Sequence, residues 1–319
     1  MNTPNLKTQK QIIENRIRLF ALAMFVLFLL VNAHRACSQG AAVTPTRFTV
    51  VDEGTVSKPD VVLIPGLTSG REVWAAEATR LAPNYRLHLV QIDGFAGQPA
   101  GPNATGEGIL PAIVNQLHDY IVTNHMHPAV VGHSLGGLLT LMFAEKYPGD
   151  VSKIVIVDSL PFYGMMFGPQ MTPAMIQPQA AKMRDAWEAS HDPVAHHARA
   201  EQTANFLVLN PEGRKLVMQE SLDSDQHVAA EAMYEDLQTD VRGELPKMRT
   251  KALMLYPYDP TLVGPDGKVP TQQEFDALYQ GAYKPMPNVT VVRVDHSRHF
   301  IMLDQPEKFD ALLEAFLKS

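Results

Sequence analysis

A serine between two glycines is the first feature that could do chemistry, in a segment of the form G-x-S-x-G: Gly132-His133-Ser134-Leu135-Gly136. A short β-branched run at 129–131 precedes the segment, and an apolar helical stretch at 138–147 follows it. A serine at a sharp strand-to-helix turn is held in a strained conformation that exposes its hydroxyl above the sheet edge. The pattern predicts that Ser134 is a nucleophile. The alternative is a glycine-rich turn that only joins two elements.

The segment and its context resemble the α/β-hydrolase superfamily, and the likeness covers nearly all of the chain from residue 46 except a stretch in its middle. This resemblance implies a nucleophile, an acid and a histidine in that order along the chain. His299 fits the last position, because an apolar run, an acid and a proline follow it as in the superfamily; Arg298 replaces the usual small residue before it. His296 is the competing histidine. We expect His299 to act as the general base of Ser134.

The acid of this arrangement has three candidates. Asp259 is our choice, because it comes just after the apolar run at 252–255. The superfamily often has a glycine where Tyr256 stands, so the match is incomplete. Asp266 and Asp158 are the alternatives, and we expect Asp158 to make the ordinary turn of an aspartate at the end of a strand.

Two backbone N–H groups should form an oxyanion hole. One belongs to Leu135, the residue after the nucleophile. The other is expected from Leu67, because Pro65-Gly66-Leu67-Thr68 resembles the superfamily's H-G-x segment. Pro65 replaces the common histidine there but leaves the donor intact.

Strand and helix patterns alternate over most of the chain, which is typical of a mostly parallel sheet with helices on both faces. The expected fold class is therefore α/β, and the resemblance implies an α/β-hydrolase fold. The expected strands lie at 47–51, 61–64, 85–92, 129–131, 154–157, 252–255 and 289–294. The expected helices lie at 72–81, 107–124, 138–147, 272–283 and 307–318.

The alternation stops between about residues 161 and 248, where helical stretches are separated by prolines. We expect this segment to be a helical cap inserted into a hydrolase domain at 43–319. The cap is rich in methionine, which fills irregular apolar gaps, so a cap core explains the composition. An alternative interpretation is that some of its side chains form a substrate pocket facing the serine, namely Phe162, Met165, Met166 and Phe167.

The first 36 residues have the layout of a secretory signal peptide, with basic residues before an apolar run from Leu19 to Val31. We expect an exported protein, periplasmic or secreted. An uncleaved N-terminal anchor is the alternative, although the run is short for a membrane span. Cys37, the only cysteine, excludes an intramolecular disulfide and leaves lipidation as a further option.

The composition argues against some classes of partner and cofactor. The chain of 319 residues is 45% hydrophobic with a formal net charge of -7, which suits a large core and argues against nucleic acid as a partner. Neither His196-His197 nor His125-x-His127 comes with the other ligands of a zinc site, so no metal and no organic cofactor is expected.

The expected function is hydrolysis of a carboxylic ester, with a small or medium hydrophobic molecule as substrate, through an acyl-serine intermediate. An amidase or aminopeptidase, a C–C hydrolase and a cofactor-free perhydrolase use the same scaffold and remain alternatives. A binding protein without catalysis is the alternative from another class.

Overall fold

The computed structural model describes residues 44–189, 192–264, 267 and 269–319. Pro45–Ser319 forms one compact unit. The expected signal segment at 1–36, Cys37 and the alternative acid Asp266 lie outside the described residues. Within the described part of the chain, no helix is both long and apolar enough to cross a membrane.

Seven strands form one sheet in the order β1-β3-β2-β4-β5-β6-β7, and only β1 runs antiparallel to its neighbour. The strands are β1 (Phe48–Gly54), β2 (Asp60–Ile64), β3 (Arg86–Ile92), β4 (Ala129–His133), β5 (Lys153–Val157), β6 (Lys251–Tyr258) and β7 (Val289–Asp295). Apolar β-branched runs form the central strands because a parallel sheet is buried on both faces.

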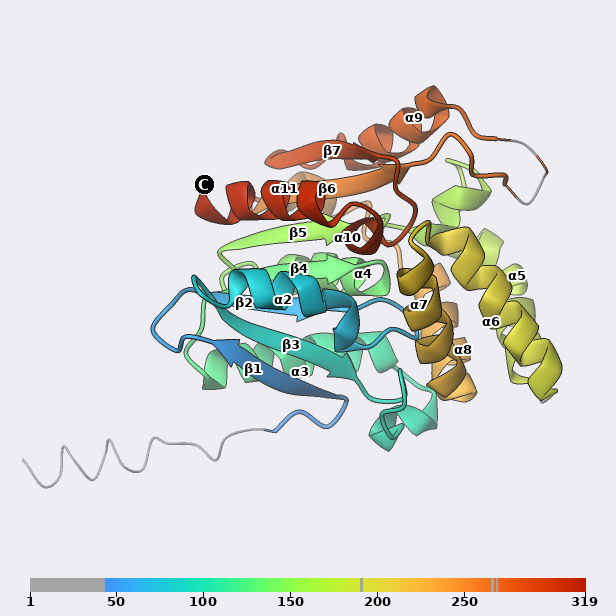
Figure 1. Ribbon diagram of the computed structural model, residues 1–319, viewed down its shortest axis with the longest axis horizontal. Coiled ribbons are helices and arrows are strands. Elements are labelled where there is room, and N and C mark those ends of the chain that lie inside the picture. The colour runs from blue at the N-terminus through green and yellow to red at the C-terminus, as the bar shows by residue number, and fades with distance from the viewer. Residues whose placement is uncertain (1–43, 190–191, 265–266, 268) are drawn as a thin grey trace, which may run out of the picture. The chain divides into compact units, whose positions relative to one another are not determined.

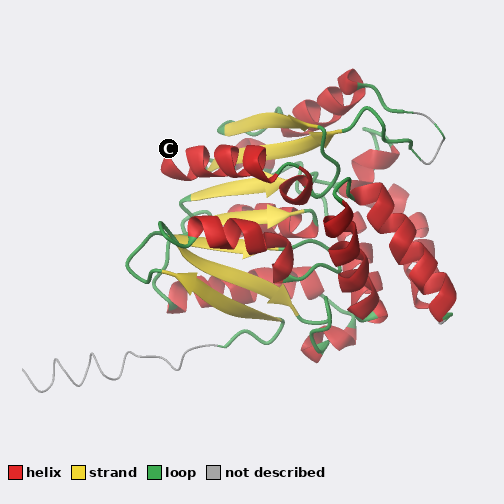
Figure 2. Cartoon of the chain, in the orientation of Figure 1, coloured by secondary structure: helices red, strands yellow, loops and turns green. Residues whose placement is uncertain are grey.

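Helices cover both faces of the sheet, as Figure 2 shows. Along β2, Val61 and Leu63 join the core under α2 (Ala75–Leu81) and α11 (Pro306–Lys318). Val62 and Ile64 join the core on the other face, under α3 (Ile109–Thr123), α4 (Leu135–Lys146) and α9 (Gln272–Tyr283). A mostly parallel sheet of seven strands with helices on both faces confirms the predicted fold class.

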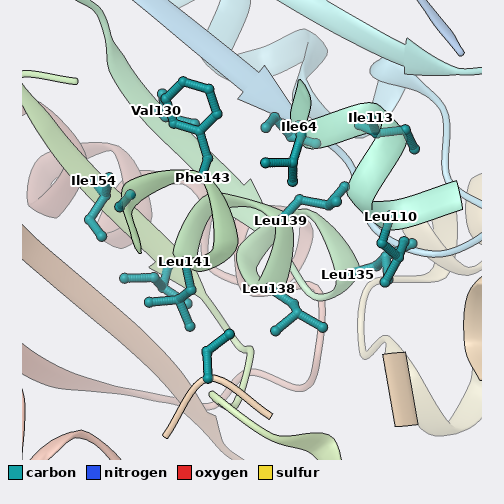
Figure 3. Packing of buried hydrophobic residues seen from close by; sticks show 14 of the residues in the cluster. Ile64, Leu110, Ile113, Val130, Leu135, Leu138, Leu139, Leu141, Phe143 and Ile154 are labelled. Atoms are coloured by element: carbon teal, nitrogen blue, oxygen red, sulfur yellow. The ribbon is translucent and has the colours of Figure 1, made fainter. Parts of the chain in front are cut away.

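The central helix α4 begins directly after Ser134 and is buried on nearly every side. Its apolar side chains pack against β2, β4 and α3, as seen in Figure 3 around Leu139 and Phe143. A helix apolar all round belongs inside a protein. The serine at its start is therefore anchored in the buried core.

Between β5 and β6, the described residues form helices and no strand: η3 (Tyr163–Phe167), α5 (Pro173–Glu188), α6 (Pro193–Leu207), α7 (Pro211–Asp223), α8 (Gln226–Gln238) and η4 (Leu245–Lys247). The prolines at 173, 193 and 211 stand at helix starts, where a missing N–H costs nothing. These helices lie beyond the carboxyl ends of the parallel strands (Figure 1). The segment predicted as a cap is thus placed over the edge of the sheet where Ser134 lies.

Three short elements complete the fold. The 3-10 helices η1 (Arg71–Trp74) and η2 (Gly101–Thr105) follow β2 and β3, and α10 (Ile301–Asp304) lies between β7 and α11.

Candidate active site

Ser134 lies at the turn between β4 and α4 in a strained conformation, with φ 54° and ψ −120°. Its N–H donates a hydrogen bond to the carbonyl oxygen of Val157 at 2.9 Å, which ties the turn to β5. The two glycines of the motif are required by packing. A Cβ at Gly132 would overlap the carbonyl of Gly136, and a Cβ at Gly136 would overlap the carbonyl of Ile64. The sequence expectation for this turn therefore has a direct geometric reason.

His299 lies on the loop between β7 and α10, and its Nδ1 is 2.6 Å from Oδ2 of Asp158. Asp158 follows β5 directly, and His133 at the end of β4 pairs with Val157 at the end of β5. The carboxylate and the serine therefore stand on neighbouring strands of one sheet edge. A carboxylate on Nδ1 leaves Nε2 as the nitrogen available to a serine hydroxyl.

The carboxylate of Asp158 is buried and held from its other side. Its Oδ1 accepts a hydrogen bond from the Tyr279 hydroxyl at 2.5 Å, and its N–H donates to the Leu255 carbonyl at 2.8 Å. Burial, and then the charge of Asp158, raise the pKa of Tyr279 well above its ordinary value. Tyr279 therefore remains a donor and fixes the carboxylate toward His299.

The prediction that Asp259 pairs with His299 is wrong in this structure. Oδ2 of Asp259 accepts a hydrogen bond from Nε of Arg298 at 2.7 Å, and Oδ1 accepts the N–H of Thr261 at 2.9 Å. Burial alone would raise the pKa of Asp259, but the bonds from Arg298 and Thr261 outweigh it and lower that pKa. The carboxylate of Asp259 therefore binds Arg298, the residue before the histidine, and not His299.

Arg298 links this loop to the cap as well, since its Nη1 donates to the carbonyl of Asn205 at 2.6 Å. His296, the competing histidine, is exposed, and its carbonyl accepts a hydrogen bond from Gln305. The structure therefore brings His299, and not His296, to the carboxylate.

His133 precedes the serine in the chain and contacts the loop that carries His299. Its ring is fully buried, 4.5 Å from the ring of His299 between centroids, and Nε2 lies 3.0 Å from the carbonyl oxygen of His299. Burial, and then the charge of His299, lower the pKa of His133 well below its ordinary value. His133 is therefore a neutral donor that positions the loop.

The loop after β2 passes close to the serine. A Cβ at Gly66 would lie 3.0 Å from Cβ of Ser134 and 3.0 Å from Nδ1 of His133. Leu67 follows immediately and is half-buried, while Leu135 is the first residue of α4 and fully buried. Leu135 is thus adjacent to the serine in the chain, and Leu67 follows the glycine whose backbone comes close to the serine.

A sequence model of the alpha/beta hydrolase family matches residues 61–312, which include Ser134, Asp158 and His299. The chain belongs to the alpha/beta hydrolase family. The match starts in β2 and ends in α11, so it includes the cap as well as strands β2 to β7.

Three relatives of this hydrolase share one name. A pimeloyl-[acyl-carrier protein] methyl ester esterase of Vibrio vulnificus is 28% identical over 81% of this chain and 94% of that protein. The protein of the same name from Nitrosospira multiformis is 23% identical over 82% of this chain and 95% of that protein. The one from Pectobacterium atrosepticum is 33% identical, but the match covers only 33% of this chain and 38% of that protein.

Solved structures share the fold of this hydrolase at low identity. An esterase from Exiguobacterium antarcticum has a TM-score of 0.70 at 18% identity, over 87% of this chain and 98% of that one. The enol-lactonase from Burkholderia xenovorans has a TM-score of 0.68 at 16% identity, over 88% of this chain and 99% of that one.

The four predicted pocket residues of the hydrolase do not form one group. Phe162 is fully enclosed in a cap cluster with Ile176, Ala180 and Leu237, and the Arg242 guanidinium covers its ring at 4.5 Å. Phe162 therefore belongs to the core of the cap, and its pocket assignment is wrong.

The other three predicted pocket residues lie in η3. Met166 and Phe167 expose 54% and 47% of their surface, so they do not belong to an enclosed pocket wall. Met165 alone is half-buried and packs against both the cap cluster and the core around α4. Met165 remains the candidate for contact with a substrate.

A carboxyl group of the cap that sequence reasoning did not select lies near the histidine. Burial raises the pKa of Asp236, on α8, to about 7, and the charge of His299 opposes this rise. Asp236 follows Glu235, which bonds the start of α3, so its helix is fixed against the core. The cap therefore carries a titratable carboxyl within electrostatic range of His299. Its spacing from Ser134 along the chain gave no signal of this proximity.

Proposed function

We propose that this hydrolase cleaves carboxylic esters through an acyl intermediate on Ser134. The observation that carries the proposal is the 2.6 Å contact between His299 and Asp158 at the sheet edge where Ser134 stands in its strained turn. Such a turn, a histidine and a buried carboxylate are the parts that activate a serine hydroxyl. The chain order Ser134, Asp158, His299 also agrees with the order of the family.

In the proposed reaction, the Ser134 hydroxyl attacks the ester carbonyl while His299 Nε2 takes its proton. Asp158 stabilises the imidazolium and fixes its tautomer. The N–H groups of Leu67 and Leu135 bind the oxyanion, and each such donor contributes about 3 kcal/mol of transition-state stabilisation. His299 then protonates the leaving alcohol, and a water molecule activated by the same histidine releases the acid.

The relatives support the ester as the bond that is cleaved, because those that cover most of this chain are named as methyl ester esterases. We propose a small or medium hydrophobic acyl or alkyl group, contacted by Met165 at the junction of cap and core. We also propose that the protein is exported by its first 36 residues. Mass spectrometry of the protein from the culture and cell fractions would test this by locating the mature N-terminus.

Labelling with a fluorophosphonate probe tests the activated serine. The wild type is expected to be labelled and to hydrolyse p-nitrophenyl esters, with a preference among acyl lengths. Ser134→Ala should lose both signals, and His299→Ala should lose them almost completely, because the hydroxyl alone is a poor nucleophile. A folded wild type without labelling or turnover would favour the binding-protein alternative. Labelling that persists in Ser134→Ala would place the nucleophile elsewhere.

A further inference from the structure

Away from the serine, three metal-ligating side chains meet where two cap helices pack against each other. Glu188 is the last residue of α5, and His227 and Glu231 lie on α8. One ligand atom of each residue lies within 4.8 Å of the others. His227 and Glu231 are four residues apart, which puts their side chains one above the other on one helix face.

We infer that Glu188, His227 and Glu231 bind a divalent transition-metal cation, of which zinc is the best fit. One imidazole and two carboxylates are ligands that zinc accepts, with water in the fourth position of a tetrahedron. Calcium and magnesium prefer oxygen ligands alone, so the histidine favours zinc over them.

The side chains already point toward a shared centre. Nδ1 of His227 lies 2.6 Å from Oε1 of Glu188. Around a zinc ion with bonds of about 2.0–2.1 Å, neighbouring ligand atoms are roughly 3.3 Å apart. The pair would therefore separate by less than an ångström, while Glu231 closes on it. His227 and Glu188 are partly exposed, so their side chains are free to make this adjustment.

Gly106 packs against the imidazole of His227. Gly106, just after η2, has a left-handed φ of 68°, and a Cβ there would lie 2.7 Å from Nε2 of His227 and 2.9 Å from Cγ of Glu231. The backbone therefore closes over the Nε2 side of the ring. This contact leaves Nδ1 as the ring nitrogen that faces the carboxylates.

Charge around the three ligands also favours a cation. Nε of Arg184 lies 3.6 Å from Oε1 of Glu231, but this guanidinium also bonds Asp185 at 2.9 Å. The guanidinium of Arg184 thus interacts electrostatically with three carboxylates, those of Glu231, Asp185 and Glu188. The three carboxylates therefore outnumber the one arginine beside them, which leaves the cluster short of positive charge. A bound metal ion would supply that charge and join the end of α5 to α8.

Calorimetric titration of the purified, chelator-treated full chain with zinc tests the site, with cobalt absorption as a second readout of tetrahedral coordination. The wild type is expected to bind one ion per chain with this signature. His227→Ala and Glu231→Gln should each weaken binding roughly tenfold or more. His197→Ala, which removes another cap histidine, is the matched control and should bind as the wild type does. Circular dichroism confirms that each variant is folded.

The thiolate of Cys37 could also bind zinc, so the titration is repeated with Cys37→Ser. Unchanged binding in that variant supports the cap site. Loss of binding in Cys37→Ser, equal binding by His227→Ala and wild type, or no binding to the wild type would each overturn the inference.

Discussion

Two aspartates at the ends of neighbouring strands have different partners, and this difference predicts different effects of the same substitution. Asp158 contacts His299, whereas Asp259 contacts Arg298. Asp158→Asn is expected to lower kcat by on the order of 10⁴-fold, because the amide favours the wrong tautomer of the histidine. Asp259→Asn should leave kcat close to that of the wild type and lower stability instead, since it weakens a buried ion pair.

Ester turnover and thermal unfolding of the two variants check this prediction together. Retention of turnover in Asp158→Asn, with loss in Asp259→Asn, would return the catalytic acid to Asp259. Loss of turnover in both variants with normal unfolding temperatures would mean that the Arg298 link also positions the histidine.

Sequence order could not separate these two aspartates. Both lie between Ser134 and His299 in the chain, and both follow a buried strand that ends at the same sheet edge. The structure separates them through Arg298, whose guanidinium binds Asp259 and leaves Asp158 to the imidazole.

At the scale of elements, the strands and core helices were predictable because burial imposes their periods. The expected helix at 272–283 matches α9, and the expected strand at 154–157 matches β5 to within one residue. The cap was predictable only as helical. Its helices expose much of their surface, so their apolar positions are few and do not reveal which side chains face the serine or each other. For this reason the proximity of Asp236 to His299, and of Glu188 to His227, could not be found from spacing.

A buried carboxyl between α2 and α11 makes these elements sensitive to pH. Glu77 is fully buried, and neither of its carboxyl oxygens has a hydrogen-bond partner among the described residues. Burial, and to a smaller extent the charge of Asp310, raise the pKa of Glu77 to about 8. Because the folded state binds this proton more tightly than the unfolded state, its stabilising effect is complete below the ordinary pKa and is lost as pH rises through 8.

The free energy of unfolding of Glu77→Gln is therefore expected to match that of the wild type near pH 4 and to exceed it at pH 9 by about 5 kcal/mol. Urea unfolding at pH 4, 6 and 9 measures this difference. Glu212→Gln, which changes an exposed glutamate of α7, is the control and should show no such trend. A difference between Glu77→Gln and wild type that does not grow with pH would contradict the proposed ionisation.

At the scale of the whole described unit, polar links rather than apolar area alone fix the cap against the core. Asp304 of α10 accepts the N–H groups of Leu209 and Asn210, at 2.8 and 2.9 Å. Ser224 donates to the carbonyl of Thr68 in the loop after β2. These links reach the loops that carry His299 and the expected oxyanion donor Leu67. The position of the cap and the geometry of the proposed site are therefore coupled.

Glu235 links the cap to the core, and its removal should loosen the cap more than it affects the catalytic residues. The start of α3 has Gly108 as its cap residue and no side-chain cap of its own, and the Glu235 carboxylate instead accepts the N–H groups of Ile109 and Leu110 at 2.9 and 2.8 Å. Glu235→Ala should lower stability by about 3 kcal/mol, because two charge-assisted hydrogen bonds at a helix N-terminus are lost. The loss of stability should be greatest in the cap, because these hydrogen bonds join α8 of the cap to α3 of the core.

Hydrogen exchange and ester kinetics measure this effect. Protection in α8 and the first turn of α3 is expected to fall, while protection in β4 and α4 stays near the wild-type value. KM should rise more than kcat falls, because the cap contributes to binding while Ser134, His299 and Asp158 stay on the core. Glu244→Ala, which removes an ion pair with Lys247 at 2.7 Å on η4, is the control and should change neither readout. Equal loss of protection in β4 and α8 would show instead that cap and core open as one unit.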